Sequence, residues 1–198
     1  MKKLITILFI FLFSISCYSE TDPLYKGKIY SVEKLNVSSI ALKLNYFLNK
    51  YEQKWTKQQK SQAIRALYLG QKEFNIDYKI VMSIIAIESN YNIKAKNKKS
   101  NDYGLTQQNN RYIKQRYLVS KKYLDKYKIK YNIKNKYDVS LNIFSCYLYL
   151  KELEQTSNTL YFPHYIGAYN VGYRGLEKNS SIAYNYYIKF MKEYMSIW

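Results

Sequence analysis

Residues 81–92 read VMSIIAIESNYN, an apolar run that contains a single carboxylate, Glu88. A helical period places Glu88 seven residues after Val81 and four after Ile84, on one face of a helix. Burial on that face and the electronegative C-terminal end of the helix both favour the protonated carboxyl, so we expect a raised pKa for Glu88. A carboxyl group that keeps its proton near neutral pH is suited to general acid catalysis. The alternative is a helix-end carboxylate that faces solvent or pairs with a lysine.

The composition is that of one folded domain with a short extension. The chain has 198 residues, of which 47% are hydrophobic, and only two prolines and six glycines. These values exclude a disordered, fibrous or linker-rich protein. Few helix breakers in a chain rich in Lys, Ile and Leu favour helices.

The charge balance is strongly basic. Lys and Arg number 32 against 14 Asp and Glu, which gives a net charge of +18. Such an excess is typical of proteins that meet nucleic acid or another anionic surface. The lysines are dispersed and no motif that reads base edges is recognisable, so we expect no nucleic-acid partner. Two interpretations remain, an anionic component of a cell envelope and a compositional bias toward Lys, Asn, Ile and Tyr.

The N-terminus has the features of an export signal over residues 1–19. Lysines precede an apolar run, and small residues follow it. The run is shorter than the roughly 20 apolar residues of a membrane span. We therefore expect an exported protein of the bacterial periplasm or cell envelope. Residues 14–17 (SISC) resemble a lipobox, so lipidation of Cys17, cleavage after Ser16 or Ser19, and an uncleaved membrane anchor are alternatives.

Helix-start signals recur in the first half of the mature chain. The pattern of an amphipathic helix starts from Asn36, with Ser38 or Ser39 as candidate caps. Thr56 and Gln59 have the spacing of a capping box and predict a second helix. Asp77 can cap the apolar helix that carries the carboxylate.

In the second half, residues 112–135 are basic and aromatic and predict either a helix or a long loop. Asp138 can cap a further helix, and Ser180 or Ser181 a last one. The apolar stripe of this last helix is predicted to be Tyr184, Tyr187, Ile188 and Met191. No segment alternates with period two over a convincing length, so the pattern is that of an all-α protein.

The chain has few cysteine and histidine residues that could serve as nucleophiles or metal ligands. The chain has two cysteines, Cys17 in the signal region and Cys146 in an apolar segment, and one histidine, His164. An intramolecular disulfide framework and a His/Cys metal site are therefore not expected, and no cofactor is predicted.

Four separated blocks occur in a recognisable order. They are residues 84–92 (IIAIESNYN), 102–107 (DYGLTQ), 142–143 (NI) and 168–172 (AYNVG). In this order they resemble the Glu-Ser, Gly-Leu-Met-Gln, Asn-Ile and Ala-Tyr-Asn-Ala-Gly blocks of the lytic transglycosylases of the soluble type (SLT). That family is a branch of the goose-lysozyme-like superfamily. Tyr187 with Ile188 is similar to a Tyr-Val pair in the family's last helix, and the resemblance spans about residues 60–192.

The resemblance implies an all-α, lysozyme-like fold that cleaves peptidoglycan glycan strands. We expect an SLT-like domain over residues 59–198, after a spacer and leading helix over residues 20–58. Family enzymes cut the β-1,4 bond between N-acetylmuramic acid and N-acetylglucosamine and leave a 1,6-anhydro end. One glutamate acts as acid and then as base, and Glu88 takes that role by its place in the Glu-Ser block. Ser89 is expected to be a helix-end hydrogen bonder.

The resemblance also implies a set of substrate-binding residues. These are Asn97, Gly104, Leu105, Gln107, Tyr169 and Asn170. Gly104 would let backbone approach the sugar, with turn formation as the alternative. Gln107, Tyr169 and Asn170 would bond the glycan or orient the catalytic carboxyl, with core packing as the alternative for Tyr169. The polar residue that contacts this carboxyl would be Asn97 or Ser100.

Three features keep other functions open. A hydrolytic, lysozyme-like reaction is the alternative if Asp102 faces Glu88 across the cleft. Thr106 stands where the family usually has Met, and Gln108 where it has an apolar residue, so altered sugar packing or a binding protein without turnover is a further alternative. The opening of residues 102–107 is closest to small family members that clear wall for secretion and conjugation machines, which makes such an apparatus a candidate partner.

Overall fold

The computed structural model describes residues 36–156 and 162–197. The predicted export signal, Cys17 and the start of the predicted spacer lie outside the described residues. The helices within them are α2 (Val37–Lys50), α3 (Lys57–Phe74), α4 (Tyr78–Ser89), α5 (Asn110–Lys126), α6 (Val139–Thr156), α7 (Phe162–Val171) and α8 (Ser180–Met195). A short 3₁₀ helix, η1 (Tyr173–Gly175), connects α7 to α8. The all-α prediction is confirmed.

Two of the helix starts predicted for the first half of the chain form as expected. Thr56 and Gln59 make a reciprocal capping box at the start of α3. Asp77 accepts a hydrogen bond from the backbone N–H of Lys79 at the start of α4. The first helix starts where the pattern predicts, but its cap is Asn36, which accepts from the N–H of Ser38, and not Ser38 or Ser39.

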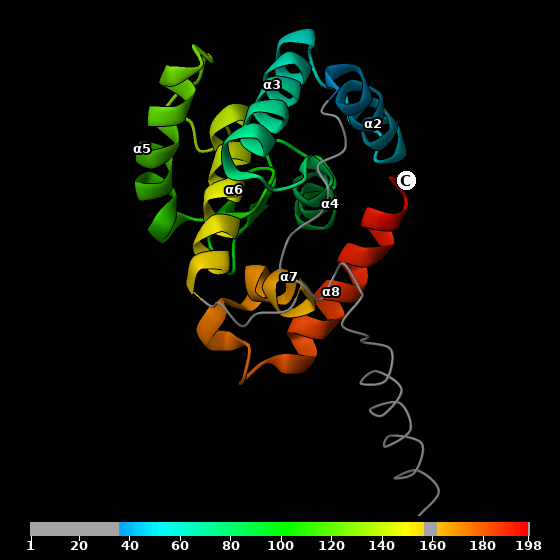
Figure 1. Cartoon of the computed structure of the whole chain (residues 1–198), viewed down its shortest axis with the longest axis vertical. Coiled ribbons are helices and arrows are strands. Elements are labelled where there is room, and N and C mark those ends of the chain that lie inside the picture. Colours follow the sequence, from blue (N-terminus) through cyan, green and yellow to red (C-terminus); the bar gives the residue numbers. More distant parts are fainter. Residues whose placement is uncertain (1–35, 157–161, 198) are drawn as a thin grey trace, which may run out of the picture.

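Helix α4 lies in the centre of the fold, where Figure 1 shows it almost end-on between the other helices. It packs against α2, α3, α6 and α8. Every residue from Tyr78 to Ala86 is buried, so the helix has no solvent-facing side along most of its length. The predicted single stripe through Val81, Ile84 and Ile85 is part of this wholly buried surface. The apolar core thus holds α4 on all sides and carries Glu88 at its C-terminal end.

The contact between α3 and α6 depends on a glycine. A Cβ atom at Gly70 would lie 2.2 Å from Cε2 of the Tyr147 ring, so this position has no room for a side chain. The hydroxyl of Tyr147 donates to the carbonyl of Leu67 over 3.0 Å. The ring therefore packs directly on the α3 backbone, and the two helices lie side by side (Figure 1).

A small antiparallel sheet follows α4, which the sequence did not predict. Its strands are β1 (Lys96–Asn97), β2 (Asp102–Tyr103) and β3 (Gln108–Asn109), in that order. Asp102 pairs with both Asn97 and Asn109 across the sheet. Two-residue strands are too short to show an alternating pattern, which explains why the sequence did not reveal them.

The segment that was predicted as helix or loop forms α5 and then a turn-rich connection to α6. Asp138 caps α6 as predicted, since its side chain accepts from the N–H of Leu141 over 3.0 Å.

The predicted orientation of the last helix is wrong. Its buried face carries Ala183, Tyr186 and Phe190, whereas Tyr184 is 61% and Ile188 48% exposed. The sequence contains two overlapping apolar stripes on this helix, and packing against α7 and α4 selects the other one. The residue before the helix is Asn179, which makes no side-chain cap, so the predicted Ser180 or Ser181 cap is wrong as well.

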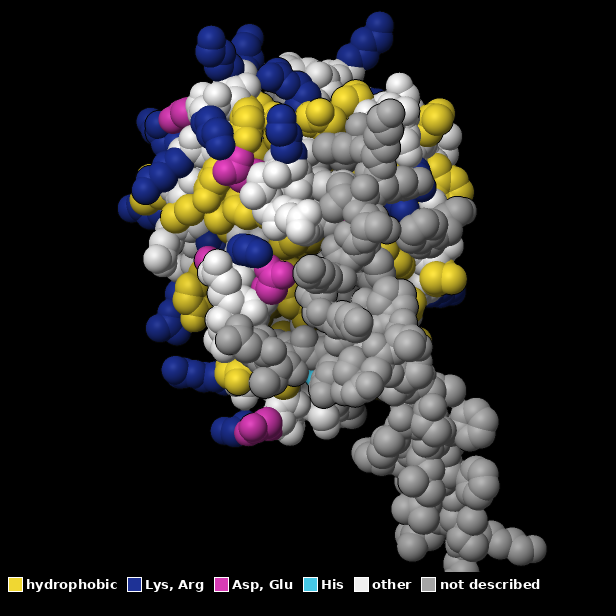
Figure 2. Space-filling model, viewed as in Figure 1, with side chains coloured by type: hydrophobic (Ala, Val, Ile, Leu, Met, Phe, Trp, Pro, Cys, Tyr) yellow, Lys and Arg dark blue, Asp and Glu magenta, His cyan; other side chains and the backbone are white. Residues whose placement is uncertain are grey.

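Surface charge is dispersed, as the sequence indicates. Lys and Arg side chains are scattered over the coloured part of the face in Figure 2, with few acidic groups between them. Within residues 36–156 and 162–197, no helix is long and apolar enough to cross a membrane. The same residues contain no cluster of His, Cys, Asp and Glu that could hold a metal ion.

Candidate active site

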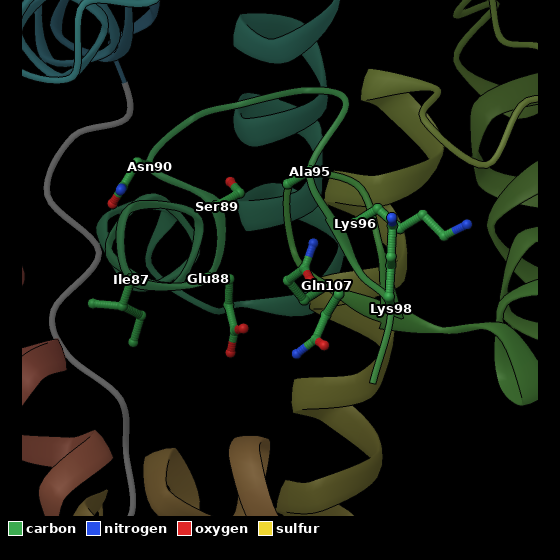
Figure 3. A pocket seen from close by; sticks show the side chains of 9 residues that line it. Ile87, Glu88, Ser89, Asn90, Ala95, Lys96, Lys98 and Gln107 are labelled. Atoms are coloured by element: carbon green, nitrogen blue, oxygen red, sulfur yellow. The ribbon is translucent and has the colours of Figure 1, made fainter. Parts of the chain in front are cut away.

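A pocket of about 440 Å³ opens at the C-terminal end of α4. Its walls come from the end of α4 and from the loop that contains the small sheet. The lining residues are Ile87, Glu88, Ser89, Asn90, Ala95, Lys96, Asn97, Lys98 and Gln107. Figure 3 shows the side chains of Glu88 and Gln107 pointing the same way into this space, with Lys96 and Lys98 on the far side of Gln107 from Glu88.

The end of α4 is fixed by an unusual turn. Asn90 and Tyr91 both have positive φ angles, of 49° and 59°, which a side chain as large as that of Tyr91 rarely adopts. Tyr91 is fully buried, its hydroxyl donates to the carbonyl of Met82, and its own carbonyl accepts from the indole N–H of Trp55. These contacts fix the turn that ends the helix at Ser89, one residue after Glu88.

Ser89 behaves as predicted for a helix-end residue. Its hydroxyl donates to the carbonyl of Ile85 over 3.0 Å, one turn earlier in the helix. Its side chain also lines the pocket beside Glu88.

The electrostatics of Glu88 favour its neutral form. The surrounding protein removes water from the carboxyl, and this desolvation raises its pKa to about 7. A hydrogen bond from the hydroxyl of Tyr186, 2.6 Å from Oε1, works in the opposite direction and lowers it. The charge of Asp102 adds a smaller upward contribution. Glu88 therefore keeps its proton to a higher pH than an ordinary glutamic acid does.

Two stacked tyrosine rings, those of Tyr186 and Tyr169, pack next to Glu88. The ring of Tyr186 stacks on that of Tyr169, with centroids 6.5 Å apart and planes inclined by 16°. The hydroxyl of Tyr169 donates to the carbonyl of Thr106 over 3.0 Å. Burial raises the pKa values of Tyr169 and of the Cys146 thiol, and the charge of the nearby Glu88 adds a smaller contribution to each. The predicted Tyr169 thus belongs to the support of the carboxyl, and its hydroxyl is bonded to protein.

Two of the predicted substrate-binding residues line the pocket. Gln107 has a positive φ of 45° and donates from Nε2 to the carbonyl of Gly104. Asn97 accepts from the backbone N–H groups of Lys99 and Ser100, which organises the loop beside the pocket. Of the two candidates for the loop position, Asn97 and not Ser100 lines the pocket with Glu88.

The other predicted residues lie outside the pocket lining. Leu105 is fully buried, and Asn170 is exposed at the end of α7. Gly104 has a φ of 78°, and a Cβ there would lie 2.4 Å from Oδ1 of Asn142. The close approach that this glycine permits is therefore to Asn142, and a contact between Gly104 and sugar stays a prediction.

Asn142, the predicted Asn of the third block, secures this loop from α6. Its Oδ1 accepts from the N–H of Thr106, and its Nδ2 donates to the hydroxyl of Tyr117 over 2.6 Å. The two departures from the family pattern also lie in this region, because Thr106 and Gln108 are both buried. Neither side chain lines the pocket, so a direct contact with sugar at these positions has no support in the geometry.

Asp102 does not share the pocket with Glu88. It stands in β2, and its Oδ1 accepts from Nδ2 of Asn109 over 2.7 Å. The charge of Asp102 raises the pKa of Glu88, but the Asp102 side chain does not line the pocket. Among residues 36–156 and 162–197, Glu88 is thus the one carboxyl group that lines the pocket.

Sequence reasoning missed Tyr186, the residue that contacts Glu88. The predicted Tyr-Val resemblance pointed to Tyr187, one residue later and half-buried. Spacing could have corrected this, because Tyr186 lies three residues after Ala183 and four before Phe190, on the stripe that is buried.

Comparison with known proteins agrees with this geometry. A search of curated proteins found no match. The family described as "Transglycosylase SLT domain" matches residues 66–191, which is more than half of the chain and includes both Glu88 and Tyr186. The chain therefore belongs to the transglycosylase SLT family and has a lysozyme-like domain that acts on peptidoglycan.

Proposed function

We propose that this protein is a lytic transglycosylase. It would cleave the β-1,4 bond between N-acetylmuramic acid and N-acetylglucosamine in peptidoglycan and leave a 1,6-anhydro end. Glu88 would be the single general acid and base. The observation that carries the proposal is a carboxyl with a pKa of about 7 at the edge of an open pocket, without a second carboxylate among the described residues that line it.

The two steps of the reaction need opposite protonation states of the same group. Neutral Glu88 first gives its proton to the glycosidic oxygen as the bond to the anomeric carbon breaks. The carboxylate then takes the proton of the muramic 6-hydroxyl while that oxygen bonds to the anomeric carbon. No water is consumed, and Glu88 ends protonated as it began. A pKa near the working pH serves both steps.

The Tyr186 hydrogen bond supports the second step. It bonds to Oε1 and favours the carboxylate that forms after proton donation. Desolvation favours the acid needed for the first step. The balance of these two effects leaves the pKa between that of an ordinary glutamic acid and that of a fully dehydrated one.

A hydrolytic muramidase is the second candidate, and Asp102 is the observation that favours it. An inverting hydrolase places a second carboxylate so that it can activate water on the opposite face of the sugar. Asp102 affects the pKa of Glu88 but is bonded to Asn109 and lies outside the pocket lining. The geometry therefore favours the reaction that needs one carboxylate.

The test is the Glu88→Gln variant, assayed for release of soluble muropeptides from purified sacculi. We expect release to fall at least about a thousandfold, because the proton donor and acceptor are both removed. Glu73→Gln is the matched control. Glu73 lies on α3 and pairs with Lys126 over 2.9 Å, so this substitution removes a surface carboxylate and should leave activity unchanged. Activity of Glu88→Gln close to that of the unaltered protein would refute the assignment.

We also propose that the protein works in the cell envelope, where its substrate is found. This rests on the export signal expected over residues 1–19. Membrane anchoring through Cys17, and service to one secretion or conjugation apparatus, are proposals of the same kind. Fractionation of cells that express the full chain or Cys17→Ala tests the anchor, since lipidation predicts that only the unaltered chain sediments with membranes.

A further inference from the structure

The buried amide of Gln108 makes three hydrogen bonds to protein groups. The residue is 2% exposed. Its Nε2 donates to the hydroxyls of Thr106 and Tyr169, both over 3.1 Å. Its Oε1 accepts from Nη1 of Arg116 over 2.9 Å. A buried amide without partners would be strongly destabilising, whereas a fully bonded one holds its neighbours in one arrangement.

Arg116 fixes the orientation of this amide. A guanidinium group has only donors, so the oxygen of Gln108 must face it and the NH₂ group must face Tyr169. Arg116 reaches this position from α5 and lies over the ring of Tyr149, 3.9 Å from its centroid. Its other terminal nitrogen is 3.6 Å from a carboxylate oxygen of Glu152. The guanidinium is therefore held by α6 while it bonds a residue of β3.

Gln108 is connected to Glu88 through Tyr169 and Tyr186. The hydroxyl of Tyr169 accepts from Gln108 and donates to the carbonyl of Thr106, and it also lies within hydrogen-bond reach of the Cys146 thiol. Its ring stacks on Tyr186, whose hydroxyl bonds Glu88. Rotation or displacement of Tyr169 would leave the Tyr186 ring without a neighbour on that side.

We propose that Gln108, oriented by Arg116, is a positioning residue that holds Tyr169 and thereby the Tyr186 hydroxyl that hydrogen-bonds Glu88. This rests on the proposed role of Glu88 as the acid and base. The polar residue Gln108, at a buried position where the family usually has an apolar residue, would thus orient the catalytic site. Gln108 contacts neither substrate nor the reacting carboxyl, and it acts through two tyrosine rings.

A double-mutant cycle tests the proposal in the full protein. Gln108→Met keeps the length of the side chain and removes its hydrogen bonds. We expect kcat for muropeptide release to fall roughly tenfold, as for loss of one hydrogen bond to a charged group, with KM changed less than about threefold. We also expect the alkaline limb of the pH profile to move to higher pH, because the Tyr186 bond that lowers the pKa of Glu88 is weakened.

The decisive comparison uses the Tyr186→Phe background. There the bond to Glu88 is already gone, so Gln108→Met should lower kcat by less than about twofold if it acts through that bond. An equal loss of kcat in both backgrounds, or an unmoved pH profile for the single variant, would overturn the proposal. Arg116→Met provides an independent second cycle if Gln108→Met does not fold, and it should show the same dependence on Tyr186.

Gln71→Met is the matched control. Gln71 is also 2% exposed, and its Oε1 accepts from the N–H of Tyr78 at the opposite end of α4 from Glu88. The same substitution there should lower stability but leave kcat per folded molecule and the pH profile unchanged. A matching kcat loss in this control would show that any buried glutamine has this effect and would overturn the proposal. Failure of the proposed function is seen separately, as retained activity in Glu88→Gln.

Discussion

The hydroxyl of Tyr186 donates a hydrogen bond to Oε1 of Glu88 over 2.6 Å and joins two residues that are 98 positions apart in the sequence. Tyr186 comes from α8 and Glu88 from the end of α4, and the two helices pack closely. The contact opposes the desolvation that raises the pKa of the carboxyl. The acidity of Glu88 is therefore set jointly by the apolar core around α4 and by one phenol from the last helix.

Tyr186→Phe should move the alkaline limb of the activity profile to higher pH. The hydrogen bond stabilises the carboxylate, so its loss raises the pKa of Glu88 above about 7. The acid form then persists to higher pH, while kcat at the optimum falls because the carboxylate needed in the second step is less stabilised. Initial rates of sacculus digestion between pH 5 and 9, fitted for the maximum rate and for the pH midpoint of the alkaline limb, measure both effects. A limb that moves to lower pH contradicts this account of the contact.

Asp102→Asn should shift the same limb in the opposite direction. The Asp102 charge disfavours ionisation of Glu88, so a neutral amide lowers the pKa of Glu88. The variant can still accept the hydrogen bond from Asn109, which preserves the sheet. Initial rates of sacculus digestion should show the alkaline limb at lower pH, and the released muropeptides should have the same ends as those from the unaltered protein. Loss of activity at all pH values would instead assign Asp102 a direct part in the reaction.

Glu88→Gln should stabilise the folded protein at alkaline pH. Glu88 titrates at about 7 when folded and near its ordinary value of 4.5 when unfolded. Below the unfolded value both states are protonated, and between the two values only the unfolded state ionises, so the stability contribution is lost as pH rises. Glutamine does not titrate and avoids this loss, which amounts to a gain on the order of 3 kcal/mol above pH 8 relative to pH 4. Urea unfolding at both pH values measures it, and a difference independent of pH contradicts the raised pKa.

Gly104→Ala should be much more destabilising than Gly172→Ala. Both glycines have positive φ angles, of 78° and 73°, so both substitutions carry a backbone cost of about 1 kcal/mol. At Gly172 nothing lies within 4 Å of the new Cβ, whereas at Gly104 it would meet the side chain of Asn142 at 2.4 Å. We expect an additional loss of roughly 2 kcal/mol for Gly104→Ala from this overlap. Thermal unfolding of the two variants gives the comparison. Equal losses of stability would show that the Asn142 side chain moves away from the new Cβ at no cost.

The features that the sequence predicted well are those fixed by local chemistry. The capping box of Thr56 and Gln59, the cap at Asp77 and the apolar length of α4 each follow from residues close in the chain. The position of Glu88 at the end of that helix was likewise predictable, and so was the upward direction of its pKa. The match over residues 66–191 agrees with the four blocks that pointed to the family.

The features that were missed depend on contacts between distant segments. Helix α8 has two apolar stripes, and only the packing of Ala183 against Gly167 of α7 and of Tyr186 against α4 selects the buried one. The strands β1 to β3 have two residues each, too few for a periodic signal. The role of Gln108 could not be predicted because its partner Arg116 is on another element and its bond to Tyr169 spans 61 positions.

The most direct test of the central claim is the mass of the muropeptides that the unaltered protein releases from purified sacculi. In a transglycosylase the muramic 6-hydroxyl oxygen bonds to the anomeric carbon in place of water, so the products are lighter by one water than those of a hydrolase. We predict that every product carries a 1,6-anhydromuramic end and that Glu88→Gln releases at least about a thousandfold less of it. Reducing ends in place of anhydro ends, or release by Glu88→Gln close to that of the unaltered protein, would contradict a single-glutamate transglycosylase.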